Sequence, residues 1–459
     1  MSSVKSPRSA SNKPGLAVRL AAAKLLGAVI DARTALDGLT DENNGHPAYL
    51  ALDARDRALL RAILLSALRH RSQITDVLAH RLERPLPKNA RSLEHHLHVG
   101  ATQILFLDVP DSAAVNLGVE AVSGDPRSKR FAGLANALLR RIAREKDRIH
   151  GWMQHNPPRA PDWLGDRLID AYGEDRAEAI AEAHAHEAPL DLTVKDDPKL
   201  WAERLDGAVL STSTVRIPSP SAAVPDLEGF TEGAWWVQDA ASALPARLFR
   251  DLNGKRALDL CAAPGGKTAQ LAAGGASVTA VEINNNRARR LAANLERLSL
   301  EAEVITGNAL ELSLADIQAG DGFDAVLLDA PCSSTGTIRR HPDVAWTKTP
   351  EDVAKLADLQ FRLLERAATF VRVGGMLVFS NCSLLPEEGE AVTDAFLAAH
   401  PGYRLEPSNW RELGADEEVL APMVTPRGTL RTTPELLPAP EPRMAGLDGF
   451  HAARFVRER

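Results

Sequence analysis

Five stretches in the second half of the chain decide its fold. They read RALDLCAAPGGKT (256–268), SVTAVEINNN (277–286), EVITGNA (303–309), FDAVLLDAPC (323–332) and GGMLVFSNCS (374–383). Most open with a short aliphatic run that leads into a glycine or polar turn, and segments with helical spacing of apolar residues lie between them. Strands that alternate with helices in this way form a mostly parallel, doubly wound sheet. The sequence therefore predicts a Rossmann-like α/β domain over residues 235–459.

The first part of the chain has a different texture. Apolar residues recur there at helical spacing, as at Leu60, Ile63, Leu64 and Ala67. No strand pattern interrupts residues 16–150, so we predict an all-α domain behind a flexible tail of residues 1–15. Residues 151–234 contain prolines around two strand-like stretches, PLDLTV (189–194) and VLSTSTVRI (209–217). We interpret this segment as a small α+β linking module.

Composition excludes several classes of protein. The 459 residues are 44% hydrophobic and 25% charged, and no apolar run reaches the roughly 18 residues of a membrane span. Only three cysteines occur, without a CxxC pair, and the histidines His95, His96 and His98 lack carboxylates or thiols at matching spacing. We expect a cytoplasmic monomer with free thiols and no metal. The Ser/Lys/Arg-rich start, followed by an amphipathic stretch, superficially resembles a transit peptide, but the stretch from Leu16 to Ile30 is more simply the first helix of a folded domain.

Charge is unevenly distributed along the chain. Residues 1–150 contain 23 Lys and Arg against 15 Asp and Glu, a net charge of +8, whereas the remainder carries −15. A basic first part on an acidic protein suggests a polyanionic partner. The alternative is that the arginine-rich helices are simply solvated.

A nucleotide-type cofactor is indicated at the strand ends. The turn at Gly265 and Gly266 lets backbone N–H groups approach a ligand at a helix start, although alone it is only a tight strand-to-helix connection. Glu282 ends the next strand seventeen residues later, where a carboxylate can hold ribose hydroxyls, and Asn308 follows as a possible reader of adenine. Together they favour an adenosyl cofactor. NAD is disfavoured because no G-x-G-x-x-G turn is present.

Two cysteines fall at the ends of the last two strands. Cys332 and Cys382 are fifty positions apart in sequence but should lie at neighbouring strand ends. A single buried cysteine is ordinarily a small hydrophobic residue, whereas two beside a cofactor pocket suggest nucleophilic chemistry by a thiolate. Asp329, three residues before Cys332, is placed to bind a polar edge of the substrate.

These residues belong to ordered motifs that resemble the NOL1/NOP2/Sun group of RNA cytosine-5 methyltransferases. The matching stretches are QDAASA (238–243), DLCAAPGGKT (259–268), DAPCSSTG (329–336), RRHPD (339–343), NCSLLPEE (381–388) and DGFHAARF (448–455). The helical domain, with FAGLANALLRRI (131–142), is similar to the NusB-like RNA-binding domain of the bacterial small-subunit ribosomal RNA member of the group. The resemblance covers nearly the whole chain.

The resemblance implies a methyl transfer from S-adenosylmethionine to carbon 5 of a cytosine in RNA, most simply small-subunit ribosomal RNA. It implies that Cys382 attacks carbon 6 and that Cys332 assists elimination, with Asp329 as the third catalytic residue. It also implies cofactor contacts by Asp329 and by the residues Cys261, Ala262, Ala263, Pro264, Gly265, Gly266, Lys267, Glu282 and Asn308. Arg339 and Arg340 resemble a loop that meets RNA, though alone they read as a solvated pair.

Two positions depart from the usual pattern of the group. Asn308 replaces a common aspartate and Asn381 a common threonine, and the first change could weaken adenine recognition. Two alternatives stay open at this point: a methyltransferase for transfer RNA, and a non-enzymatic RNA-binding factor of ribosome assembly or antitermination. Amino-group methyltransferases are disfavoured, because the chain has Asp-Ala-Pro-Cys where they use a D/N-P-P-Y/F-like turn.

Overall fold

The structure, a computed structural model, describes residues 13–317 and 320–459. The contacts divide it into two compact units. The first comprises the described residues up to Asp162 together with His341–Thr347, and the second comprises Trp163–Arg340 and Lys348–Arg459. Most of the tail predicted for residues 1–15 lies outside the described residues.

The first unit is helical, as the spacing of its apolar residues predicts. Its helices are α1 (Leu16–Ala32), α2 (Leu36–Leu39), α3 (Pro47–Leu50), α4 (Ala54–Arg69), α5 (Arg71–Ala79), α6 (Arg91–Phe106), α7 (Asp111–Gly124), α8 (Ala132–Arg144), α9 (Lys146–Met153) and α16 (Val344–Thr347). The predicted stripe Leu60, Ile63, Leu64 and Ala67 is fully buried on α4. Asp53 caps this helix by accepting a hydrogen bond from the backbone N–H of Asp56 at 2.8 Å.

The histidines of α6 are buried core residues. His98 donates through Nδ1 to the carbonyl of Glu94 at 2.9 Å, and burial lowers the pKa of His98 to about 3. His95 lies 2.7 Å from the carboxylate of Asp31. Within residues 13–317 and 320–459, no group of three or more His, Cys, Asp or Glu side chains is arranged to hold a metal ion.

A short segment from late in the sequence belongs to the first unit. Within His341–Thr347, the indole of Trp346 donates to the carbonyl of Leu68 at 3.1 Å, and Asp343 accepts from the backbone N–H of Leu36 at 3.0 Å. The segment directly follows the two arginines of the RRHPD motif. Nothing in its local sequence marks it as part of the helical unit.

Helices α10 (Asp162–Tyr172), which lies in the second unit from Trp163 on, and α11 (Glu174–His184) open the second unit. A four-stranded antiparallel sheet follows in the order β2 (Ala208–Val209), β3 (Val215–Ile217), β1 (Leu190–Val194), β4 (Trp235–Val237). Helix α12 (Pro198–Arg204) packs on it around Leu192, Val215 and Trp235. The stretch 209–217 thus forms two strands rather than one, because Ser213 turns the chain with a φ of 57°.

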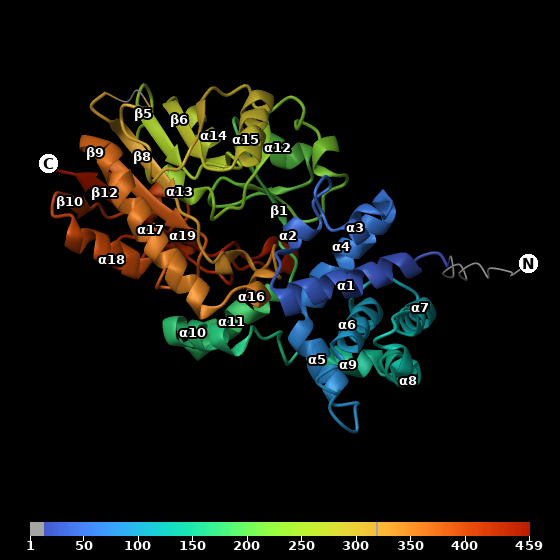
Figure 1. The fold of residues 1–459 in the computed structure, drawn as a ribbon. Coiled ribbons are helices and arrows are strands. Elements are labelled where there is room, and N and C mark those ends of the chain that lie inside the picture. Colours follow the sequence, from blue (N-terminus) through green and yellow to red (C-terminus); the bar gives the residue numbers. More distant parts are fainter. Residues whose placement is uncertain (1–12, 318–319) are drawn as a thin grey trace, which may run out of the picture. The chain divides into compact units, whose positions relative to one another are not determined.

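The main sheet has the mostly parallel topology that the sequence predicts (Figure 1). Its order is β10 (Tyr403–Leu405), β12 (Phe450–Arg457), β9 (Val371–Asn381), β8 (Phe323–Asp329), β5 (Arg256–Leu260), β6 (Ser277–Glu282), β7 (Glu303–Thr306), with β11 (Leu430–Thr432) also pairing with β12. The run from β9 to β7 is parallel, and β10, β11 and β12 pair antiparallel.

Alternate residues of the central strands face opposite sides. On β8, Val326 and Leu328 join the core beneath α17 (Pro350–Phe370) and α18 (Glu390–Ala399), whereas Ala325 and Leu327 join the core beneath α13 (Leu244–Arg247). The remaining helices are α14 (Gly266–Ala273), α15 (Asn285–Arg297) and α19 (Glu417–Leu420). Burial on both faces explains why these strands read as continuous apolar runs.

The strand order reverses between β5 and β8. Sequence order runs from β5 outward through β6 and β7, then returns to β8 and β9 on the other side of β5. In open α/β sheets this switch point, at the carboxyl ends of the strands, is where ligands bind.

No described helix has both the length and the apolar character needed to cross a membrane.

Candidate active site

The turn after β5 is shaped by left-handed backbone and a buried carboxyl group. Gly265 has a φ of 103°, and a Cβ there would lie 3.2 Å from Leu291, so only glycine suits the position. Asp259 is fully buried and accepts a hydrogen bond from the hydroxyl of Thr268 at 2.6 Å, which ties β5 to α14. Burial raises the pKa of Asp259 to about 7 and that of Cys261, in the turn, to about 12. Sequence reasoning had not singled out Asp259.

Glu282 ends β6 beside this turn. Its carboxylate is 1% exposed, accepts from the backbone N–H of Asn284 at 3.0 Å, and lies 3.4 Å from the N–H of Ala263. Arg287 pairs with it at 3.3 Å. The carboxylate is therefore held against the glycine turn, at the edge of the sheet where the sequence predicts a ribose contact.

Asn308, at the end of β7, is held within its own loop. Its amide donates to Glu311 at 2.7 Å and its carbonyl oxygen accepts from the backbone N–H of Leu310 at 3.1 Å. The side chain is half-buried. Its predicted contact with adenine remains a prediction.

Asp329 ends β8 between a group from the first turn of α14 and one from the end of β9. Lys267 donates to one carboxylate oxygen at 2.7 Å, and the hydroxyl of Ser380 donates to the other at 2.9 Å. The ammonium group of Lys267 also lies 4.9 Å from the centre of the Phe450 ring. These contacts orient a partly exposed carboxylate at the switch point.

The two cysteines meet at the ends of β8 and β9. The Sγ atoms of Cys332 and Cys382 are 3.4 Å apart, within sulfur hydrogen-bond distance, and both residues are partly exposed. The hydrogen bond with Cys382, together with burial, raises the pKa of Cys332 well above its usual range. Cys332 therefore keeps its proton and can share it with Cys382.

A buried carboxylate that sequence reasoning missed holds both cysteine loops. Glu388 is fully buried and accepts from the hydroxyl of Ser333 at 2.5 Å and from that of Ser383 at 2.6 Å, the residues that follow the two cysteines. The backbone N–H of Ser333 donates to it at 2.8 Å and Gln360 at 3.1 Å. The signal was present in the PEE sequence, but adjacent glutamates normally indicate a solvated surface.

Asn381, the second departure from the usual pattern, supports the same loop. Its amide donates to the carbonyl of Glu388 at 2.7 Å, and its oxygen accepts from the backbone N–H of Ser383 at 3.0 Å. The asparagine thus closes the turn that carries Cys382.

Arg340 is engaged inside the second unit. It donates to Asp448 at 3.2 Å, to Asp239 at 2.5 Å and to the carbonyl of Pro189 at 2.9 Å. Although burial lowers it, the neighbouring carboxylates hold the pKa of Arg340 above its usual value, while burial raises the pKa of Asp448 to about 7. Arg339 is buried and donates to the carbonyl of Ala445 at 2.9 Å. Contact of either arginine with RNA stays a prediction.

Comparison with known proteins assigns this arrangement to a family. Residues 247–456 match the family described as 16S rRNA methyltransferase RsmB/F, and residues 16–144 match the NusB family. Proteins named ribosomal RNA small subunit methyltransferase B are 33% identical in Vibrio vulnificus, with 96% of this chain and 99% of the relative covered, and 34% identical in Pseudomonas putida, with 96% and 98% covered. A solved methyltransferase homologue from Pyrococcus horikoshii has a TM-score of 0.50 at 26% identity over 64% of this chain and 93% of its own. The chain therefore belongs to the 16S rRNA methyltransferase RsmB/F family.

Proposed function

We propose that the protein methylates carbon 5 of a cytosine in small-subunit ribosomal RNA through a covalent bond between Cys382 and carbon 6 of the base. Family membership establishes the coarser activity, methylation of ribosomal RNA with S-adenosylmethionine as methyl donor. It also confirms the prediction that the protein is an enzyme, against the alternative of a non-enzymatic RNA-binding factor. The observation that carries the covalent mechanism is the 3.4 Å separation of the Cys332 and Cys382 sulfur atoms.

The residues at the switch point fit S-adenosylmethionine. Backbone N–H groups at the start of α14, after Gly265, suit the carboxylate of its methionine part, and the carboxylate of Glu282 suits the ribose hydroxyls. Asp329 lies across the turn, paired with Lys267. When bound, the cofactor supplies an electrophilic methyl group. These residues bind and orient it, and the cysteines act on the base.

Carbon 5 of cytosine is a weak nucleophile and needs activation. The Cys382 thiolate adds to carbon 6, and the displaced electron pair moves onto carbon 5, which then takes the methyl group. Asp329 accepts a hydrogen bond from the amino group of the base and so keeps the ring in register. A thiolate then removes the carbon 5 proton, the ring double bond re-forms, and the Cys382–carbon bond breaks.

The hydrogen bond between the sulfurs orders the two cysteine roles. While Cys382 carries the negative charge, Cys332 keeps its proton, because two thiolates 3.4 Å apart would repel. Once Cys382 is bonded to carbon 6, that charge is gone and Cys332 can lose its proton to solvent. The Cys332 thiolate is then the base for the carbon 5 proton.

A stalled covalent adduct tests this division of roles. Cys332→Ala should trap the protein on its RNA as a slow-migrating, denaturant-resistant, ribonuclease-sensitive band in cells that express it. Cys382→Ala and the double variant should give no band, although both should still bind S-adenosylmethionine by isothermal titration. An adduct in Cys382→Ala alone would reverse the roles, and no adduct in any variant would contradict the covalent mechanism.

The predicted setting of the enzyme follows from its substrate. We place it in the cytoplasm, where bacterial ribosomal RNA is found, and propose that it acts as a monomer, since one chain supplies both cysteines and the cofactor turn. Bisulfite mapping of total RNA with and without the gene would identify the modified nucleotide. A lost signal in transfer RNA alone would contradict the ribosomal assignment.

A further inference from the structure

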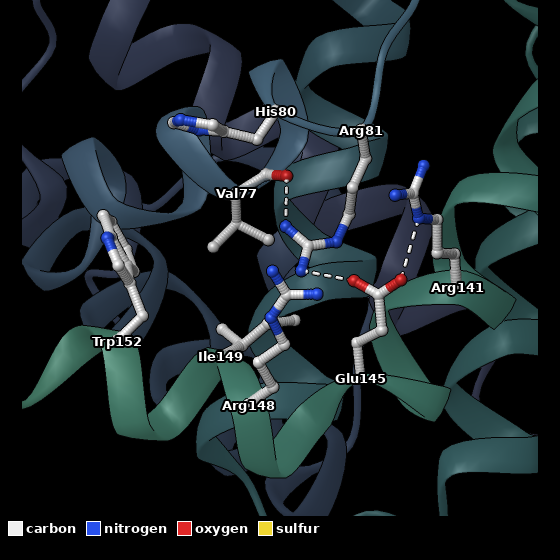
Figure 2. Close-up of a pocket in the computed structure, with 8 residues that line it drawn as sticks. All are labelled: Val77, His80, Arg81, Arg141, Glu145, Arg148, Ile149 and Trp152. Atoms are coloured by element: carbon white, nitrogen blue, oxygen red, sulfur yellow. Dashed lines mark hydrogen bonds and ion pairs between the residues drawn. The ribbon is translucent and has the colours of Figure 1, made fainter.

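The first unit contains a pocket of about 270 Å³ formed at the end of α5, at the α8–α9 junction and on α9. Val77 and Ile149, both buried, form its apolar floor. Figure 2 shows the indole of Trp152 on one side and the carboxylate of Glu145 with its arginines on the other. The volume lies just below the range of about 300–1,000 Å³ typical of small-molecule sites, so the pocket suits one compact planar group.

One wall of the pocket carries more positive than negative charge. Glu145 accepts from Arg81 at 2.7 Å and from Arg141 at 2.9 Å. Arg148 also lines the pocket, is exposed, and has no hydrogen-bond or ion-pair partner among the residues that the structure describes. Three guanidinium groups thus face one carboxylate, and the surplus charge favours an anion.

Arg81 offers a buried donor that the protein leaves unused. Its side chain is 10% exposed, and its two terminal nitrogens donate to the carbonyl of Val77 and to Glu145. Its Nε–H group is buried without an acceptor in the described part of the chain. Buried donors without partners are rare, because a group taken out of water loses its hydrogen bonds to it, and a ligand or ordered water commonly satisfies such donors.

The opposite wall is aromatic. Trp152 is partly buried on α9, with its ring at the pocket, and His80 also lines the pocket, with Nδ1 donating to the carbonyl of Asp76 at 2.7 Å. A planar indole next to arginines is the combination by which proteins bind unpaired bases, by stacking on the ring and pairing the phosphate with guanidinium groups.

We propose that this pocket binds one unpaired nucleotide of single-stranded RNA, with the base stacked on Trp152 and the backbone phosphate held by Arg148 and Arg141. The inference rests on the proposed function, since it names the part of the RNA substrate that the helical unit takes. The surrounding unit, whose segment 1–150 carries a net charge of +8, favours a polyanion over a free metabolite.

Binding of a short unstructured oligoribonucleotide to the full-length protein tests the site. Trp152→Ala should weaken the affinity at least about fivefold, and Trp152→Phe should restore most of it, because a ring remains for stacking. Arg148→Gln should lower the slope of log affinity against log salt by about 0.7, the value for one phosphate of a single strand. Arg144→Gln is the matched control, since Arg144 is exposed on α8 but does not line the pocket.

Cross-linking keeps the test independent of variant stability. Photoreactive RNA bound to the wild-type protein should cross-link to the peptide that contains residues 141–153. Equal affinity of wild type and Trp152→Ala, or equal loss in Arg148→Gln and Arg144→Gln, would overturn the proposal in favour of diffuse attraction. Adenosine monophosphate that binds as tightly as the RNA would also overturn it, by making the pocket a free-nucleotide site.

Methyl transfer to small-subunit ribosomal RNA, measured on the same preparations, separates this proposal from the proposed function. If the pocket takes substrate RNA, Trp152→Ala should raise KM and leave kcat unchanged. A wild-type protein without methylation activity would contradict the proposed function, whatever the oligonucleotide result.

Discussion

The buried carboxylate of Glu388 accepts hydrogen bonds from the loops of both cysteines. Glu388→Gln replaces one acceptor oxygen with an amide NH2 group, which would face either the hydroxyls of Ser333 and Ser383 or the N–H groups of Ser333 and Gln360. We expect kcat to fall about 10- to 100-fold, because displacement of reacting atoms by about 1 Å has effects of that size. The free energy of unfolding should fall by about 1–3 kcal/mol.

Steady-state kinetics, thermal unfolding and cofactor titration together check this prediction. Glu387→Gln is the matched control, since Glu387 is adjacent in sequence but makes only a surface ion pair with Arg167 at 2.8 Å. S-adenosylmethionine binding should be retained in both variants. If Glu388→Gln loses stability but keeps kcat, the residue supports the fold without positioning the cysteines.

Asp259 should make the stability of the protein depend on pH near neutrality. Burial raises its pKa in the folded state to about 7, against about 3.9 in the unfolded chain. The folded state therefore binds the extra proton between about pH 4 and 7, and its stabilising effect is lost as the pH rises through that window. The Asp259→Asn side chain cannot ionise. The free energy of unfolding of this variant, relative to that of wild type, should therefore increase as the pH rises from 5 to 8.

Denaturant unfolding at several pH values measures how the free energy of unfolding changes with pH. This pH dependence, and not the absolute stability, is the quantity to compare. The exposed Asp251→Asn is the comparison, with an expected change within about 0.5 kcal/mol. Parallel profiles for wild type and Asp259→Asn would contradict the raised pKa.

At the scale of elements, Arg340 joins three stretches that are far apart in sequence. Its guanidinium meets Asp239 before α13 and Asp448 before β12, and lies 4.0 Å from the fully buried Asp191 of β1. Arg340→Gln should leave Asp239 and Asp448 without their shared cation, whereas Asp191 keeps its buried ion pair with Arg216 at 2.7 Å. We expect the free energy of unfolding to fall by about 3–5 kcal/mol. The exposed Arg443→Gln, which loses only a bond to Ser219, is the control.

Thermal unfolding and RNA affinity, measured on both variants, distinguish a structural Arg340 from one that contacts RNA. The structure favours a large loss of stability. Unchanged stability with weakened RNA binding would instead support the prediction that the RRHPD loop meets the substrate directly.

At the scale of the whole molecule, positive charge is concentrated in the first 150 residues. A protein without these residues should retain cofactor binding by titration but bind RNA more weakly, with a shallower salt dependence in electrophoretic shifts at two salt concentrations. Its melting temperature should also fall, because Trp346 and Asp343 lose their partners Leu68 and Leu36. Unchanged RNA affinity and salt slope would contradict the electrostatic role of the helical unit.

Local sequence determined much of this protein. The spacing of apolar residues predicted a helical first part and a parallel sheet in the second. A helix buried on one face repeats apolar residues every three or four positions, and a strand buried on both faces is a short apolar run, so both patterns are visible over a few residues. The strand ends predicted that Cys332 and Cys382 would meet, since parallel neighbours end at the same edge of the sheet. The ordered motifs identified the family and its cofactor.

Tertiary structure decided what depends on contacts between distant segments. The PEE and RRHPD sequences look solvated, yet Glu388 is buried among hydroxyl and amide donors, and Arg340 lies among carboxylates that are distant in sequence. Asn308 is satisfied inside its own loop, the segment His341–Thr347 belongs to the helical unit, and Trp152 shares a pocket with Arg81. A charged or polar side chain carries no periodic signal of burial, because its burial depends on the partners that folding brings to it.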